Sequence, residues 1–326
     1  MMALPQQFIG RLSLPVISAP MFLASNPRMV IENCKAGVIG TFPAANQRTT
    51  EGFEQWVVEI KQALSDFEAS SGKQAAPFGV NIIIHKTNPR VEADLAILVK
   101  HQVPLLITSL GAVASVVDAV HSYGGVVFHD VTNAKHGKKA MQAGVDGLIG
   151  VCAGAGGHAG TTHPFALVQE LRSFFDKTII LAGGISTGEE IAAVRCLGAD
   201  LVSMGTRFLA TTECPVNPDY KQMIIDSSAV DIVYTDAISG VPASFLKQSI
   251  ENAGYDLNNL PRPDGFDIGT ETSLDDHVKD GEVTAKPWKD IWSAGHGISA
   301  ITEQLTIAQL IDQLASGYQQ ALKRLS

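Results

Sequence analysis

The stretch "GVVFHDVTNAKHGKKAMQAGVDGLIGV" at residues 125–151 contains one complete strand–helix–strand pattern. Residues 125–130 and 146–151 are apolar almost throughout rather than alternating, which is typical of parallel strands buried on both faces. The segment between them ends at Gly144, which suits a left-handed helix C-cap, and the next strand begins almost at once. Units of this kind build a parallel sheet whose neighbouring strands are connected by helices.

The same alternation runs along most of the chain. Eight apolar runs can be read as strands: 15–19, 38–42, 78–83, 104–109, 125–130, 146–151, 178–183 and 200–205. Eight repeated strand–helix units predict an α/β fold of the closed (β/α)₈ TIM barrel type. An open, doubly wound sheet is the competing interpretation.

Helix signals lie between the runs. Asn26 and Pro27 open "NPRMVIENCKAG" as a cap and a first helical residue. "TTEGFEQWVVEIKQAL" opens on threonine with an acidic first turn. "STGEEIAAVRCLG" closes on Gly198, which suits a left-handed C-cap.

The pattern changes after the eighth run. Residues 212–290 are polar and loop-rich, with helical candidates at 218–228 and 242–254. Residues 301–325 have apolar residues at helical spacing and would supply the eighth covering helix. We therefore expect a barrel domain of residues 1–211 plus 291–326 and a small helical insertion at 212–290. The insertion would lie over the C-terminal face of the barrel, where barrel enzymes build their active sites.

Composition narrows the class of protein. The chain has 326 residues, 45% of them hydrophobic, and a net charge of −9. This content favours a large folded core over disorder. Nucleic acids and anionic membranes bind clustered Lys and Arg, so the negative balance argues against both partners. No run approaches the ~18 apolar residues of a membrane span, and "MMALPQQFIG" does not resemble a secretory signal.

The four cysteines are widely separated and include no C-x-x-C pair. We therefore expect no metal site, no disulfide framework and a reducing, cytoplasmic location.

Two glycine features end the seventh and eighth runs. Gly183 and Gly184 lie in "LAGGIS", and Gly205 and Thr206 lie in "SMGTRF". The loops after strands seven and eight of (β/α)₈ enzymes often bind phosphate, because glycine lets backbone N–H groups approach an anion. These residues are therefore phosphate-site candidates. Turn formation alone is the alternative.

His158 is the polar side chain of "VCAGAGGHAG" (residues 151–160), which follows the sixth run. Glycine and alanine would let this backbone pass close to a planar cofactor ring. The imidazole could then take a proton from a carbon acid or hold an anionic substrate. A surface or capping histidine is the alternative.

The other histidines carry weaker signals. His129 could act on a cofactor or form a core pair with Asp130, and His296 lies in a glycine-bracketed loop that would return to the barrel mouth. Surface or capping roles are expected for the rest, which are His85, His101, His121, His136, His163 and His277.

Several of these motifs together resemble the nitronate monooxygenase (2-nitropropane dioxygenase-like) family of FMN-dependent TIM-barrel enzymes. They are "PVISAPM", "PFGVNI", "AGAGGHAG", "LAGGIS" and "SMGTRFLATTECP", which span nearly the whole barrel. The resemblance implies oxidation of alkyl nitronates, and of nitroalkanes, by O₂ to carbonyl compounds and nitrite. It implies that His158 is the catalytic acid/base. The cofactor-binding residues that it implies are Pro20, Met21, Phe22, Asn81, Ile83, Asp130, Val151, Gly156, Gly157, Ala182, Gly183, Gly184, Gly205 and Thr206.

FMN rather than FAD is expected, because the site ends in one phosphate cradle and no G-x-G-x-x-G follows the first strand. Two other functions stay open. Similar flavin barrels include NAD(P)H-dependent quinone and enoyl reductases, and a non-catalytic flavin-binding or phosphate-binding module would keep the glycine loops. A homodimer is also an open alternative.

Asp130 departs from the pattern of some relatives, which place a lysine near the flavin at the end of strand five. A carboxylate would not stabilise an anionic reduced flavin as a cation does. Either Lys135 or Lys86 supplies the positive charge, or the electron donor differs.

Overall fold

The computed structural model describes residues 3–260, 277–279 and 282–325. Eight parallel strands form a closed barrel, in which the last strand pairs with the first through Ile17 and Ser203. The strands are β1 (Val16–Ser18), β2 (Ile39–Pro43), β3 (Phe78–Ile83), β4 (Leu105–Ser109), β5 (Val126–Val131), β6 (Gly147–Val151), β8 (Thr178–Ala182) and β9 (Leu201–Met204). Each falls on one of the predicted runs. Closure confirms the TIM barrel and excludes the open sheet.

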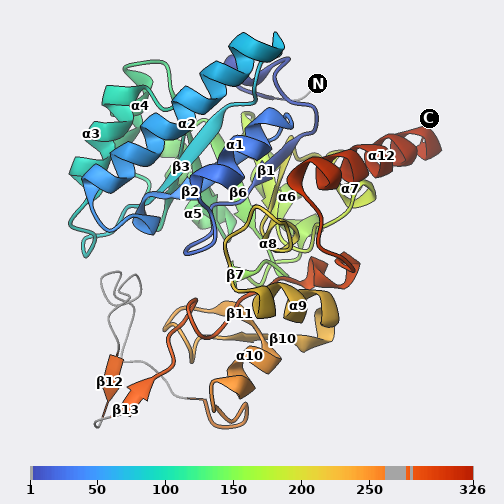
Figure 1. The fold of residues 1–326 in the computed structure, drawn as a ribbon. Helices are drawn as coiled ribbons and strands as arrows, with labels where there is room; N and C mark the ends of the chain where they lie inside the picture. Colours follow the sequence, from blue (N-terminus) through green and yellow to red (C-terminus); the bar gives the residue numbers. More distant parts are fainter. Residues whose placement is uncertain (1–2, 261–276, 280–281, 326) are drawn as a thin grey trace.

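Helices cover the outside of the barrel (Figure 1). They are α1 (Pro27–Lys35), α2 (Thr50–Ser71), α3 (Val91–His101), α4 (Ala114–His121), α5 (Ala134–Gln142), α6 (Pro164–Arg172), α7 (Gly188–Leu197) and α12 (Ile307–Leu325). Helix α12 packs against α7 and α1 and completes the ring, as the sequence predicted.

The predicted helix ends are present. Asn26 accepts a hydrogen bond from the Met29 amide at the start of α1, and Pro27 is its first residue. Thr187 and Glu190 form a reciprocal capping box at the start of α7. Gly144 and Gly198 follow α5 and α7 with φ of +91° and +109°.

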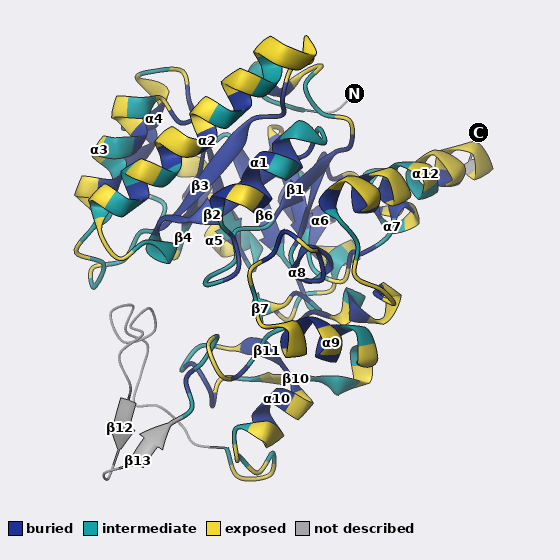
Figure 2. Cartoon of the chain, viewed as in Figure 1, coloured by how far each residue is buried: buried dark blue, intermediate teal, exposed yellow. Residues whose placement is uncertain are grey.

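The core has two layers because alternate strand residues face opposite sides. The barrel interior contains Ile17, Ile107, Phe128 and Ile180, together with Phe8 of η1 (Gln6–Phe8). Phe8 meets Phe128 edge-on, with ring centroids 6.0 Å apart. The outer layer fills the space between strands and helices. Figure 2 shows the strands buried and the exposed residues on the outer helix surfaces.

The segment after β9 contains strands as well as helices. It comprises α8 (Thr206–Leu209), α9 (Pro218–Asp226), η3 (Ala229–Asp231), β10 (Ile232–Thr235), β11 (Ala243–Leu246), α10 (Lys247–Asn252), β12 (His277–Lys279) and β13 (Glu282–Thr284), followed by η4 (His296–Ala300). The insertion, predicted as small and helical, therefore contains short strands in addition to its helices. Residues 242–254 include strand β11 before helix α10, because β11 pairs with β10 on one side and with β7 (Gly157–His158) on the other.

Strand β7 belongs to the loop after β6, so this three-stranded sheet joins the inserted segment to the loop that carries His158. A short helical turn, η2 (Ala44–Asn46), follows β2. Among the described helices, none combines the length and the apolar character needed to cross a membrane.

Candidate active site

The C-terminal ends of the barrel strands form a floor of polar and small side chains. Phe128 on β5 faces the barrel interior, and Asp130 faces the same side two residues later. The same step of two residues separates Ile107 from Ser109 on β4 and Ile180 from Ala182 on β8. Strand alternation thus places this floor directly above the apolar barrel core.

A cavity of about 1180 Å³ opens above the floor. Its volume exceeds the roughly 300–1,000 Å³ of a typical small-ligand site, so it has room for more than one small ligand. Every residue predicted to be catalytic or cofactor-binding lines it, namely Pro20, Met21, Phe22, Asn81, Ile83, Asp130, Val151, Gly156, Gly157, His158, Ala182, Gly183, Gly184, Gly205 and Thr206. The fold therefore brings together residues from six of the eight barrel strands or the loops that follow them.

Three side chains on the floor form a hydrogen-bonded row. Asn81 Nδ2 donates to Ser109 Oγ over 2.8 Å, and Ser109 Oγ donates to Asp130 Oδ2 over 2.5 Å. Burial raises the pKa of Asp130 to about 6, while the hydrogen bond from Ser109 opposes the rise. Ser109 is not among the residues predicted from the sequence. Its position as the last residue of a predicted strand was the available signal.

The turn after β8 has the backbone of an anion cradle. Gly183 and Gly184 have φ of +127° and +68°, a region that favours glycine. A Cβ on Gly183 would lie 2.7 Å from Cys152 Sγ, whereas a Cβ on Gly184 would meet no atom within 4 Å. Ser186 Oγ is buried at the cavity wall without a hydrogen-bond partner in the structure. The turn thus offers open backbone and an uncommitted hydroxyl to a ligand.

Two amides that directly precede α7 already have a hydrogen-bond acceptor. Glu190 Oε2 accepts hydrogen bonds from the Ser186 and Thr187 amides. An anion at this end of the cavity would therefore rely on the glycine turn rather than on these two amides. On the neighbouring strand, Thr206 Oγ1 accepts the Gly295 amide over 2.9 Å and keeps its own proton to donate.

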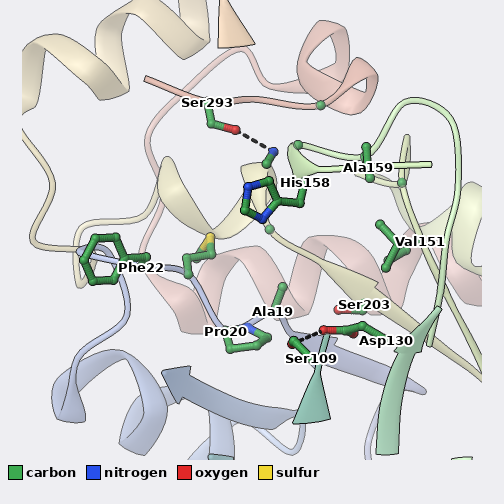
Figure 3. A pocket seen from close by; sticks show the side chains of 18 of the residues that line it. Ala19, Pro20, Phe22, Ser109, Asp130, Val151, His158, Ala159, Ser203 and Ser293 are labelled. Carbon is green, nitrogen blue, oxygen red and sulfur yellow. Dashed lines mark hydrogen bonds between the residues drawn. The ribbon is translucent and has the colours of Figure 1, made fainter. Parts of the chain in front are cut away.

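His158 enters the cavity from the side opposite Ser109 and Asp130 (Figure 3). Its backbone is held by pairing with Ala243 of β11. The preceding amide, that of Gly157, donates to Ser293 Oγ over 2.6 Å. The imidazole meets Trp288 edge-on, with ring centroids 5.2 Å apart. The inserted segment and the stretch before η4 thus fix this histidine, which sequence spacing alone did not reveal.

Close backbone packing explains part of the glycine content of this loop. A Cβ on Gly156 would lie 2.9 Å from the backbone of Ala294 and Gly295. A Cβ on Gly295 would lie 2.5 Å from Gly154 O. The prediction attributed these glycines to a cofactor ring alone, whereas the structure shows that two chain segments also need them in order to pack together.

The two histidines with weaker signals differ in their place, because one lines the cavity and the other does not. His129 does not pair with Asp130: its Nδ1 lies 2.7 Å from Thr108 Oγ1, and burial lowers its pKa to about 4. It is therefore neutral near pH 7 and lines the cavity. His296 is exposed and does not line the cavity, although its loop does.

Among the histidines expected at surface or capping positions, His163 accepts the Phe165 amide at the start of α6. His101 and His121 contact Glu54 and Asp146. His136 is exposed, as expected, and it also lines the cavity. His85 is partly buried beside Thr87. His277 lies outside the residues whose side chains the structure describes.

Neither of the lysines expected to supply positive charge near a reduced flavin lines the cavity. Lys86 and Lys135 are exposed and are not among the lining residues, whereas Lys139 and Lys289 line the cavity. Within the described residues, no group of three or more His, Cys, Asp or Glu side chains gathers as a metal site. The four cysteines are free thiols.

Comparison with known proteins identifies the family. The profile of the nitronate monooxygenase family matches residues 7–317. The chain belongs to this family. Its members are flavin-dependent oxidoreductases.

Two similar proteins carry different names. A nitronate monooxygenase of Paraburkholderia phytofirmans is 25% identical, over 95% of this chain and 94% of the relative. A (3aS,4S,5R,7aS)-5-hydroxy-7a-methyl-1-oxo-octahydro-1H-indene-4-carboxyl-CoA dehydrogenase of Rhodococcus jostii is 28% identical, over 76% of this chain and 66% of that protein.

Two solved structures share the fold. The nitroalkane oxidase of Streptomyces ansochromogenes has a TM-score of 0.78 at 23% identity and covers 97% of this chain and 99% of its own. FabK of Thermotoga maritima has a TM-score of 0.76 at 24% identity and covers 96% of this chain and 95% of its own.

Proposed function

We propose that the chain binds FMN in the barrel-mouth cavity and oxidises alkyl nitronates with O₂ to carbonyl compounds and nitrite. The observation that carries the proposal is the convergence of three features on one cavity: the two glycine loops, the row of polar floor residues and His158. Membership of a flavin-dependent oxidoreductase family supports the same activity. The named nitronate monooxygenase relative supports the choice of nitronates.

The residues of the cavity fit FMN. Gly183 and Gly184 on one strand end, with Gly205 and Thr206 on the next, would hold the phosphate through backbone N–H groups and the Thr206 hydroxyl. The buried, unpaired Ser186 Oγ is a further donor at the same wall. Small residues such as Ala182 and Gly156 would leave room for a planar ring. When bound, FMN supplies the electron transfers.

The side chains of the protein supply proton transfer and binding. His158 would remove the α-proton of a neutral nitroalkane or hold the nitronate anion. Asn81 presents a buried amide from the floor, and its orientation is fixed by donation to Ser109. Trp288 and Pro242 line the outer cavity and would limit the access of water.

The inserted segment would act as a cover over the cavity. We treat residues 1–211 plus 291–326 as the barrel domain and residues 212–290 as the inserted domain. Tyr220 and Tyr234 of that segment line the cavity, and the Tyr234 hydroxyl donates to Ala159 O over 2.9 Å. The insertion is therefore the part of the chain best placed to select substrates.

Anaerobic flavin bleaching tests the proposed activity. The FMN-loaded protein is mixed without O₂ with a nitronate in one sample and with NADH or NADPH in another. Bleaching by the nitronate, followed by nitrite release once O₂ is admitted, is the expected result. Bleaching by NAD(P)H alone would overturn the proposal in favour of a quinone or enoyl reductase. A flavin that neither donor bleaches would indicate a binding module.

A further inference from the structure

Asp130 is the only carboxylate among the described residues that line the cavity. It lies at the inward-facing end of β5, directly above Phe128 of the barrel core. Its one hydrogen bond from a side chain comes from Ser109 Oγ. None of the ion pairs among the described residues includes Asp130, so its charge is not balanced by direct contact with a cation.

The residues beside Asp130 on the two neighbouring strands are uncharged. Ser109 and Thr108 come from β4, and Ile149 and Val151 come from β6. His129 precedes Asp130 on β5, and it is neutral near pH 7 because burial lowers its pKa to about 4.

Four other groups that can carry positive charge line the same cavity. His136 and Lys139 come from α5 and are exposed, and Lys289 follows Trp288. His158 projects from the opposite side of the cavity (Figure 3). The pKa of the Asp130 carboxyl is shifted by its burial and by the Ser109 hydrogen bond.

We propose that Asp130 is a proton-carrying residue of the cavity floor, which takes up one proton from solvent when negative charge is delivered to the cavity. This inference rests on the proposed function, because the charge is delivered by electron transfer to the bound flavin. A nearby negative charge disfavours a carboxylate, and the effect is strong in a cavity of low dielectric constant.

The charge balance of one reduction cycle is simple. Delivery of two electrons by a reductant such as dithionite, together with one proton, to bound FMN would leave one added negative charge in the cavity. The Asp130 carboxylate then takes one proton from solvent, which restores the total charge. Oxidation of the flavin by O₂ reverses the shift and returns the proton.

The surroundings of Asp130 determine the pH range in which it takes up a proton on reduction. Burial, opposed by the hydrogen bond from Ser109, brings the pKa of Asp130 to about 6 in the absence of added charge. Well below pH 6 the carboxyl is protonated before reduction and takes up nothing further. Above pH 6 Asp130 is mostly ionised before reduction. It then takes up a proton on reduction, until the pH exceeds the pKa that Asp130 has in the presence of the added negative charge. Proton uptake by Asp130 is therefore expected at pH 7 and absent at pH 5.

Infrared difference spectroscopy of the FMN-loaded protein tests the inference. The protein is reduced anaerobically with dithionite at pH 5 and at pH 7, and the reduced-minus-oxidised spectrum is read for a protonated carboxyl stretch. The wild type should gain this band at pH 7 and not at pH 5. Asp130→Asn should lack the gain, whereas Asp312→Asn, which changes an exposed carboxylate on α12, should keep it.

Ser109→Ala separates a titrating role from a structural one. The Ser109 hydrogen bond lowers the pKa of Asp130, so its removal should move the window of proton uptake to higher pH. Reduction without a new carboxyl band at pH 7, or a band that persists in Asp130→Asn, would overturn the inference. Retention of the band without nitronate oxidation would overturn only the proposed function. A protein that binds no flavin would overturn both.

Discussion

Gly184→Ala is the most informative single substitution in the proposed phosphate cradle. Gly184 lies on the cavity wall with φ of +68°, and an added Cβ would meet no protein atom within 4 Å. The methyl group therefore creates no clash within the protein, but it projects from the turn that we assign to the phosphate. Gly72 offers a matched control, because it has φ of +69° and equally open space at the C-terminus of α2.

The two substitutions should cost the same stability and differ in cofactor affinity. Alanine in a left-handed conformation costs about 1–2 kcal/mol, partly offset by the smaller entropy of the unfolded chain. Both variants should therefore lose about 1 kcal/mol of unfolding free energy. Loss of one hydrogen bond to a charged group costs about 1.5–3 kcal/mol, so Gly184→Ala should weaken FMN binding by roughly 10- to 150-fold.

Quenching of flavin fluorescence on titration of the apoprotein measures the affinity, and urea unfolding measures the stability. Gly72→Ala should bind FMN like the wild type. Equal FMN affinity in Gly184→Ala and Gly72→Ala would refute the placement of the phosphate at this turn. Gly183→Ala is unsuitable for the comparison, because its Cβ would clash with Cys152 Sγ.

Three further predictions concern the walls of the cavity and the thiols. His158→Asn should retain FMN and lower kcat/KM for a neutral nitroalkane by about 10²–10⁴-fold, with a much smaller loss for the preformed nitronate; equal losses would make His158 a binding residue. Ser293→Ala removes the acceptor of the Gly157 amide and should lower the unfolding free energy by about 1–2 kcal/mol in urea titrations. Cys196 is the exposed thiol, so one equivalent of a thiol reagent should react rapidly at pH 7.5 and none in Cys196→Ser. The other thiols should react only on unfolding, because burial raises their pKa values: Cys34 to about 12, Cys152 to about 11 and Cys214 to about 11.

The barrel could be predicted because its signals are local. Continuous apolar runs such as 146–151 indicate burial on both faces, and that is characteristic of parallel strands between helices. Helix ends such as Asn26 at the start of α1 depend on neighbours within three residues. The glycine turn after β8 could also be predicted, because its place in the barrel follows from counting the predicted strands.

The inserted segment could not be predicted equally well. Strand β11 has only four residues and leads directly into α10, so residues 242–254 resemble one helix. Its extended conformation depends on pairing with β10 and with His158, which lies far earlier in the chain. Short strands whose partners are distant leave no periodic signal.

Contacts within the site could not be predicted either, because they join residues that are far apart in the sequence. The requirement for glycine at Gly156 comes from Gly295, and the anchor of the Gly157 amide is Ser293. The raised pKa of Asp130 comes from its burial, which depends on the closed barrel. The sequence could identify residues with suitable chemistry, but the fold determines which atoms they meet.

Equilibrium binding of FMN, FAD and riboflavin to the flavin-free protein tests the central claim most directly. The phosphate cradle predicts one FMN per chain. Riboflavin, which lacks the phosphate, should bind at least tenfold more weakly, a difference of about 1.4 kcal/mol. FAD should also bind more weakly, because no glycine motif after β1 is available for a pyrophosphate. A protein that takes up no flavin, or that binds riboflavin as tightly as FMN, would contradict the account.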